Sequence, residues 1–190
     1  MWHCPGERQK MTEDPGPVDQ VTVTLKELLQ IEHCPRAWRT LDLYLVRDGP
    51  VVFYVGQAYV AFDRVWSHFY GGFKARSLLG RLILCNWPAS MHWTVELLSS
   101  RHERFAAVRQ SRGTESEGEH QLDAAERLLI QDLTPCLNEA LNRQPTPLPE
   151  AYRPPTATPT CPRSPNKLIR DAAYALKAQR RREWLESADP

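Results

Sequence analysis

An arginine and a histidine one helical turn apart, Arg64 and His68, follow a strand-like stretch of the sequence. Side chains at positions i and i+4 project from the same face of a helix, so this pair would point toward one neighbour. Arginine offers a permanently charged, planar set of donors for a phosphate, and histidine exchanges protons near neutral pH. A pair of this kind is also typical of a solvent-facing helix surface, and both interpretations remain open.

Two tyrosines, Tyr44 and Tyr54, lie on either side of a turn signal centred on Gly49. In a hairpin with this centre they are direct cross-strand partners, with both rings on one face. A pair like this commonly packs a sheet and does nothing else. Gly56, two residues after the second tyrosine, leaves room for a close approach of backbone or phosphate. The short loop 58–61 then leads to the arginine and the histidine, which therefore start beside the end of this strand.

A carboxylate interrupts an apolar helical stripe late in the chain. Glu126 falls inside a stripe formed by Leu122, Leu129, Ile130 and Leu133. A carboxylate on the core-facing side of a helix is costly unless it is paired or binds a cation. Breaks in a local pattern tend to mark functional or strained sites. A structural ion pair with Arg64 or Arg76 is the alternative interpretation.

Taken together, these residues resemble the GIY-YIG nuclease superfamily over residues 41–142. Leu43-Tyr44 stands where the family's Gly-Ile-Tyr ends, and Tyr54-Val55-Gly56 stands for Tyr-Ile-Gly. Ten positions separate the tyrosines and ten more lead to Arg64. The Arg-x-x-x-His step is similar to that of phage homing endonucleases in the superfamily. An Ala-Glu pair at Glu126, followed by Pro135-Cys136-Leu137-Asn138, resembles the family's closing signature.

Two positions depart from the family pattern. Asp42 occupies the place of the first glycine, which alters the opening turn of the motif. Gln57 stands where some members carry a lysine, which removes a cation from that position.

The resemblance implies hydrolysis of a DNA phosphodiester bond with one divalent metal, Mg²⁺ or Mn²⁺. Glu126 would be the metal ligand, because a carboxylate is a hard oxygen donor suited to Mg²⁺. Tyr54 would accept the proton of the attacking water with Tyr44 supporting it, and His68 would orient a tyrosine or relay the proton. Arg64 would stabilise the charge that develops on phosphorus. The alternative is a non-catalytic module with the same fold that binds nucleic acid or a protein, and a chance match on an unrelated α/β protein is the third reading.

Composition limits the other classes of protein. The 190 residues carry a net charge of +1, so a basic footprint for nucleic acid has to be local. No apolar run is long enough to cross a bilayer and the N-terminus lacks a secretory core, which predicts a cytoplasmic, intracellular protein without a membrane partner. The five cysteines are scattered and odd in number, which argues against a disulfide framework and a zinc ribbon. Translation from Met1 or from Met11 fits the sequence equally.

Periodicity and turn signals predict an α/β (α+β) domain, a small three-stranded antiparallel sheet flanked by helices. The expected strands are 41–46, 51–57 and 92–98, and the expected helices are 24–29, 62–70, 76–84, 123–133 and 166–186. The second of these helices is expected to stop at Gly71-Gly72. The predicted domains are a flexible leader (1–20), a GIY-YIG-like nuclease domain (21–143), a proline-rich linker (144–165) and a basic C-terminal helix (166–190).

DNA is the predicted partner, with RNA not excluded, and basic side chains outside the motif would bind its phosphates without reading sequence. A solvated surface is the alternative for the C-terminal ones. Gly56 and Asn138 are assigned structural roles, the latter in the loop after the Glu126 helix. The candidate phosphate-binding residues are Lys74, Arg76, Arg81, Arg180, Arg181 and Arg182.

Overall fold

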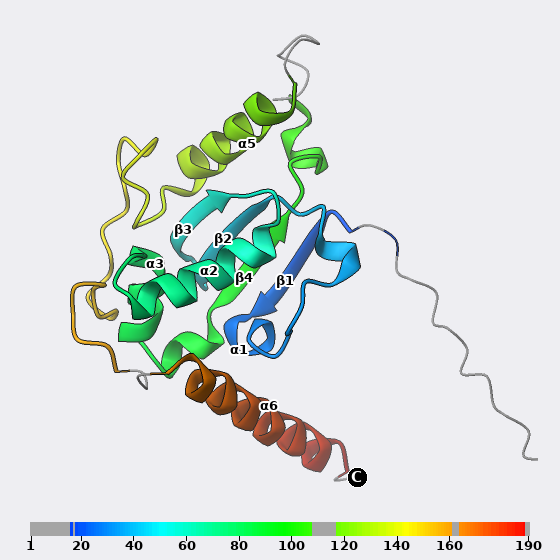
Figure 1. The fold of residues 1–190 in the computed structure, drawn as a ribbon, viewed down its shortest axis with the longest axis vertical. Coiled ribbons are helices and arrows are strands. Elements are labelled where there is room, and N and C mark those ends of the chain that lie inside the picture. Colours follow the sequence, from blue (N-terminus) through cyan, green and yellow to red (C-terminus); the bar gives the residue numbers. More distant parts are fainter. Residues whose placement is uncertain (1–15, 17, 108–116, 161–163, 189–190) are drawn as a thin grey trace, which may run out of the picture.

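Four antiparallel strands form a single sheet in the order β1-β4-β2-β3 (Figure 1). The computed structural model describes residue 16 and residues 18–107, 117–160 and 164–188. The strands are β1 (Gln20–Thr24), β2 (Leu43–Asp48), β3 (Val51–Gln57) and β4 (Thr94–Leu98). The predicted antiparallel sheet flanked by helices is confirmed, but the predicted number of three strands is wrong because β1 joins the sheet beside β4.

Strand β1 lies at the boundary of the predicted leader, most of which is outside the described residues. Its valines and threonines alternate, which suits a half-buried strand, but five residues give a weak signal. Thr24 ends the strand and also caps helix α1 (Leu25–Leu28). Its Oγ1 accepts a hydrogen bond from the Glu27 amide at 3.3 Å, and Glu27 Oε2 accepts from the Thr24 amide at 2.7 Å. These two reciprocal bonds form a capping box at the start of α1.

The remaining helices are α2 (Ala61–Phe73), α3 (Leu78–Cys85), α5 (Glu117–Leu133) and α6 (Pro165–Ala188). Short 3₁₀ turns cover Arg36–Trp38, Ala89–His92 and Glu103–Phe105. Within the described residues, no helix is both long and apolar enough to span a bilayer.

The prediction that Gly71-Gly72 ends α2 is wrong, because the helix runs on to Phe73. Gly72 instead lies where α2 crosses α3. A Cβ on Gly72 would be 2.5 Å from the carbonyl carbon of Gly80, and a Cβ on Gly80 would be 1.9 Å from the carbonyl oxygen of His68. The two glycines let the backbones touch, so these residues serve packing and not helix termination.

Helices cover both faces of the sheet. Helices α1, α2, α3 and α6 pack on one face, in a core that includes Tyr44, Phe53 and Trp93. Helix α5 covers the other face through Ala125, Leu129 and Ile130, which meet side chains of β2, β3 and β4. The hairpin β2–β3, which carries both predicted tyrosines, therefore lies between α2 and α5 (Figure 1). Helix α2 carries Arg64 and His68, and α5 carries Glu126.

Residues 144–160 run along the surface of the domain and contact it at several points. The ring of Tyr152 lies edge-on to Phe53 at 4.9 Å and to Trp93 at 5.8 Å. Asn86 exchanges two hydrogen bonds of 2.8 Å with the backbone of Arg153, and the Thr160 amide donates to the Leu84 carbonyl at 3.1 Å. The segment turns at residues 149–152 and 154–157, and side chains of the segment and of the domain attach the two to each other.

Candidate active site

The two tyrosines share one face of the hairpin but are not direct partners. Tyr44 pairs with Gly56 and Val46 pairs with Tyr54, so the predicted register is wrong by two positions at this end. The turn holds Gly49 and Pro50 between Asp48 and Val51, and Phe53 has no partner in β2. This bulge shifts the register and turns both Phe53 and Tyr54 toward the α2 side of the sheet.

The diagonal arrangement brings the tyrosine rings together over Gly56. The rings of Tyr44 and Tyr54 stack with centroids 6.0 Å apart and an angle of 27° between their planes. A Cβ on Gly56 would lie 2.4 Å from the Tyr44 hydroxyl oxygen and 2.9 Å from the Tyr54 ring. The space that glycine leaves is therefore filled by the tyrosines, where the sequence predicts room for backbone or phosphate.

His68 links the tyrosines to the start of α3. Its Nε2 is 2.7 Å from the Tyr44 hydroxyl, and its Nδ1 is 2.7 Å from Ser77 Oγ. Ser77 Oγ also accepts the Gly80 amide at 3.0 Å, which caps α3. Burial, followed by the positive charge of Arg64, lowers the pKa of His68 to about 4. The imidazole is therefore neutral at pH 7, with both nitrogens in hydrogen bonds.

Neither tyrosine is ionised at neutral pH in this environment. Burial raises the pKa of Tyr44, the neighbouring Tyr54 raises it further, and a hydrogen bond from Arg64 opposes the rise. Burial also raises the pKa of Tyr54, followed by the negative charge of Glu126. Arg64 and a hydrogen bond with Tyr44 act in the opposite direction. A base at this position needs a nearby positive charge.

Glu126 is half-buried on α5, close to the end of β3. Burial and the neighbouring Asp123 raise the pKa of Glu126, while a hydrogen bond from Gln57 lowers it. The same Gln57 donates from Nε2 to Asp123 Oδ1 at 2.6 Å. Across the described part of the chain, Glu126 forms no ion pair within 4.0 Å, so the structural pairing with Arg64 or Arg76 is absent there.

The donor set fits a magnesium ion better than a transition metal. No group of three or more His, Cys, Asp and Glu side chains suited to a metal occurs in the described ranges. Mg²⁺ keeps several waters and is commonly bound through one or two carboxylates together with a substrate phosphate. Glu126, with Asp123 one turn earlier on α5, supplies that chemistry.

A hollow of about 620 Å³ opens on the α2 side of the hairpin. Tyr54, Arg64, His68, Arg76 and Asn138 are among the residues that line it. The ring of Tyr44 is buried behind these residues, with only 1% of its surface exposed. Glu126 does not line the hollow, but its charge reaches both tyrosines. Four of the five predicted motif residues, namely Tyr44, Tyr54, Arg64 and His68, therefore lie together. Glu126 acts on the two tyrosines through its charge.

The segment after α5 attaches that helix to β3. Asn138 Oδ1 accepts from the Val55 amide at 2.9 Å, and its Nδ2 donates to the Val55 carbonyl at 2.8 Å. The amides of Cys136 and Leu137 donate to carbonyls of the same strand at 3.0 and 2.9 Å. Asn138 is buried and its amide group acts like an additional peptide unit of the sheet.

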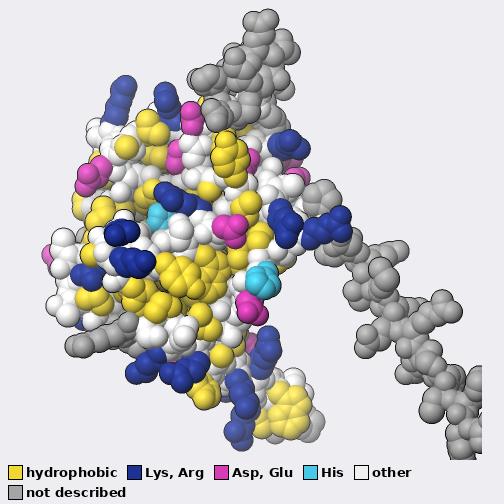
Figure 2. All heavy atoms as spheres, viewed as in Figure 1, with side chains coloured by type: hydrophobic (Ala, Val, Ile, Leu, Met, Phe, Trp, Pro, Cys, Tyr) yellow, Lys and Arg dark blue, Asp and Glu magenta, His cyan; other side chains and the backbone are white. Residues whose placement is uncertain are grey.

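The predicted phosphate-binding side chains fall into three positions. Arg76 lines the hollow and Lys74 is exposed at the end of α2. The guanidinium of Arg81 donates to the carbonyls of Pro155 and Ala157 at 3.1 and 2.8 Å, so it holds the proline-rich segment. Figure 2 shows Lys and Arg side chains around a central hydrophobic area and along α6. The exposed arginines of α6 are Arg180, Arg181 and Arg182.

Sequence reasoning missed Ser77 and the bridging role of Gln57. Ser77 precedes the apolar run of α3, and a serine in that position is a common N-cap. That signal locates the residue, but its bond to His68 depends on how α2 crosses α3. No local pattern indicates that Gln57 contacts two side chains of α5.

No protein-family model, curated protein or solved structure matches this chain. The likeness to the GIY-YIG superfamily therefore stays a prediction carried by the motif residues.

Proposed function

We propose that this protein is a metal-dependent endonuclease of the GIY-YIG type, which hydrolyses phosphodiester bonds in DNA. One observation carries the proposal. Tyr54, Tyr44, His68 and Ser77 form a continuous polar chain beside Arg64, within the electrostatic reach of a half-buried carboxylate. A module that only binds a partner has no need for a half-buried carboxylate that forms no ion pair among the described residues, since burial of such a group is costly.

A phosphate is the substrate group that fits the hollow. Arg64 and Arg76 are exposed and line it together with Tyr54. Guanidinium groups match phosphate oxygens geometrically and keep their charge at any relevant pH. A phosphodiester held there would present phosphorus to water next to the Tyr54 hydroxyl.

Glu126 would hold the metal, with Asp123 and water completing its surroundings. When bound, Mg²⁺ or Mn²⁺ supplies positive charge to the phosphate and to the departing 3′ oxygen. Neutralising Glu126 also lowers the pKa of Tyr54, because the charge of Glu126 is one cause of its rise.

The polar chain provides a route for the proton of the attacking water. The water oxygen forms a bond to phosphorus, the bond from phosphorus to the 3′ oxygen breaks, and that oxygen takes a proton from solvent. The water proton passes to Tyr54 as the Tyr54 proton moves to Tyr44 and the Tyr44 proton to His68 Nε2. This route requires the tautomer in which His68 Nδ1–H donates to Ser77 Oγ.

A cleavage assay on supercoiled plasmid with Mg²⁺ or Mn²⁺ tests the proposal. Glu126→Gln removes the anionic ligand at nearly constant size, and we expect cleavage to fall at least about 100-fold. Asp132→Asn is the matched control, since Asp132 is exposed on the same helix and contacts Arg104. It should cleave like the unaltered protein.

Full activity of Glu126→Gln would refute the metal assignment. Binding of DNA by the unaltered protein without any cleavage would favour the non-catalytic module instead. Circular dichroism of both variants checks that the fold is retained.

A further inference from the structure

One face of α6 carries a row of cations and aromatic rings. Arg170, Tyr174, Lys177, Arg181 and Trp184 follow one another at intervals of four, three, four and three residues. This spacing places them in a single stripe along a helix. All five side chains are exposed, with 71% of the surface of Tyr174 and 66% of that of Trp184 open to solvent.

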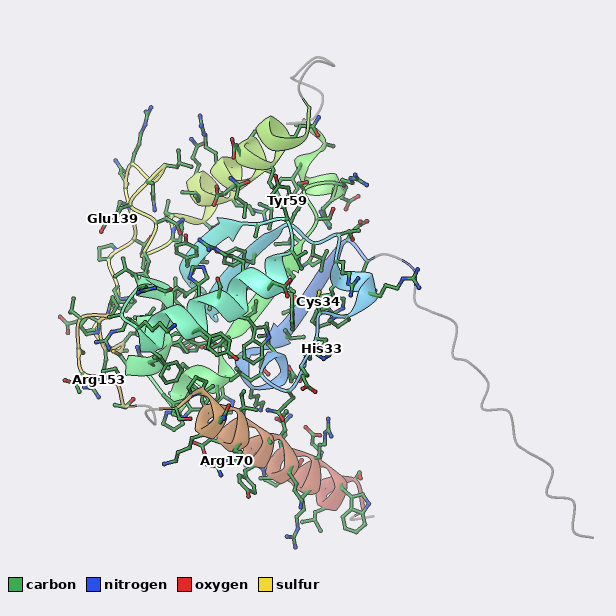
Figure 3. The ribbon with its side chains drawn as sticks, in the orientation of Figure 1. His33, Cys34, Tyr59, Glu139, Arg153 and Arg170 are labelled. Carbon is green, nitrogen blue, oxygen red and sulfur yellow. The ribbon has the colours of Figure 1, made fainter. Side chains whose placement is uncertain are left out.

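The opposite face of α6 holds the helix on the domain, so the orientation of the stripe is determined. Leu168 and Ala172 are buried in the core, and Leu176 is buried on the same face of the helix. Gln30 Nε2 donates to the Ile169 carbonyl at 3.0 Å, and Lys26 Nζ bonds to Gln179 Oε1. The stripe therefore faces away from the sheet, and Figure 3 labels Arg170 within it.

Charge is segregated on this helix. Pro165–Ala188 contains six Lys and Arg residues and three carboxylates, a net charge of +3 in a chain whose total is +1. At about 100° per residue, the three carboxylates lie roughly 100–160° away from Arg170 around the helix axis. These residues are Asp171, Glu183 and Glu186. The stripe itself contains only positive charge and aromatic surface.

We propose that this face of α6 binds unpaired, single-stranded DNA, with phosphates on the cations and bases stacked on Tyr174 and Trp184. Exposed rings between cations are suited to single strands, because every unpaired base offers a face for stacking whereas a duplex hides those faces. The stripe is about 20 Å long, at 1.5 Å per residue, which accommodates several nucleotides.

A second hollow lies beside α6 and α2. Its volume is about 710 Å³ and its lining includes Trp66, Tyr70 and Ile169, the last of which belongs to α6. Trp66 and Tyr70 stack with centroids 6.0 Å apart, and half of Tyr70 is exposed. Ser67 lines both this hollow and the one that contains Arg64.

The inference rests on the proposed function for its choice of DNA as the ligand, and its test is independent of cleavage. Fluorescence anisotropy in the presence of EDTA measures the affinity for two labelled DNAs. One is a single-stranded oligothymidylate of about fifteen nucleotides, and the other is a hairpin whose duplex stem has about the same length. Three proteins are compared: the unaltered full chain, a double variant that carries both Tyr174→Ala and Trp184→Ala, and the control variant Leu185→Ala. Leu185 is exposed on the same turn but has no ring.

We expect the full chain to bind the single strand more tightly than the duplex, and the double variant to lose at least about fivefold in affinity for the single strand alone. Leu185→Ala should bind normally. Replacing Arg170, Lys177 and Arg181 with alanine should reduce the slope of the logarithm of the affinity against the logarithm of the salt concentration by about 2.

Equal affinity for both DNAs, or unchanged binding by the double variant, would overturn the inference. Loss of affinity in Leu185→Ala equal to that in the double variant would point to a protein surface, and binding only to anionic lipid vesicles would point to a membrane. Tighter binding of an oligouridylate would assign the face to RNA. Because no metal is present, these results do not depend on whether the protein cleaves DNA.

Discussion

The ionisation of His68 is controlled by its surroundings on every side. Tyr44 contacts Nε2, Ser77 contacts Nδ1, the ring of Tyr54 lies 5.4 Å away and the charge of Arg64 is nearby. Protonation must place a second cation beside Arg64 in a largely buried position. The folded protein therefore favours the neutral ring, which can accept a proton only while negative charge is developing nearby.

This environment predicts a loss of stability in mild acid. The pKa of His68 is about 4 in the folded protein, below the value of about 6.5 for an unfolded chain. The contribution of His68 to the free energy of unfolding is fully present above pH 6.5. It is lost as pH falls toward 4, because the unfolded state binds the proton more tightly. Between pH 7 and pH 5 the loss is about 2 kcal/mol.

Urea denaturation at both pH values measures this loss, with His68→Gln as the reference that lacks the titrating group. The free energy of unfolding should fall by about 2 kcal/mol more in the unaltered protein than in the variant. Carboxylates titrate in both proteins and cancel in the difference. An equal fall in the two proteins would show that the pKa of His68 is not depressed.

The candidate site residues stand out in the sequence, whereas the hydrogen bonds that connect them do not. The tyrosines, Arg64, His68 and Glu126 stand out by residue type and spacing along the chain. The Tyr44–His68–Ser77 connection joins three elements, and its distances depend on packing between them. Local pattern carries no information about such contacts.

At the scale of elements, the crossing of α2 and α3 sets the position of His68 relative to Ser77. Gly80 approaches the carbonyl oxygen of His68 itself, so a side chain at position 80 would move that residue. Gly72 and Gly80 thus affect the position of His68 in the proposed proton route as well as the packing of α2 on α3.

We expect Gly80→Ala to destabilise the protein by about 3 kcal/mol, since the atoms that must move belong to the backbone of α2. For a chain of this size the expected fall in Tm is about 6–12 °C. Gly71→Ala is the graded control, because a Cβ there meets the Ser77 side chain at 3.0 Å and no backbone atom closer than 3.7 Å. Calorimetry of both variants tests the ranking, and equal Tm values would contradict it.

Among the elements, the longer periodic segments were predicted well and the irregular features were not. The segments that became β2, β3, α5 and α6 have clear periodicity or turn signals. The bulge at Phe53 leaves no local signature, and it shifted the register of the tyrosines. Gly71-Gly72 resembles a helix stop, and only the neighbouring α3 explains why the helix continues.

At the scale of the whole molecule, the proline-rich segment closes the core. Tyr152 covers Phe53 and Trp93, and its hydroxyl donates to Asp48 Oδ2 at 3.0 Å beside the hairpin turn. A linker composition therefore coexists with specific contacts, since the prolines set the path and a few other residues supply the attachment.

Two substitutions of Tyr152 separate these contributions. Tyr152→Phe loses the hydrogen bond and should cost about 1 kcal/mol, whereas Tyr152→Ala also loses the ring packing and should cost about 3 kcal/mol. Chemical denaturation measures both values. If the alanine variant is as stable as the phenylalanine variant, the segment does not contribute to the core.

The attachment of Asn138 to Val55 has a further consequence. Strand β3 is one of the two outer strands of the sheet, and its carbonyls at Val52 and Phe53, with both polar groups of Val55, are already engaged by the segment that follows α5. An uncovered outer strand is a template on which a second molecule adds its own strand. The side-chain amide of Asn138 and the backbone amides of Cys136 and Leu137 therefore occupy groups of β3 that would otherwise be open to such pairing.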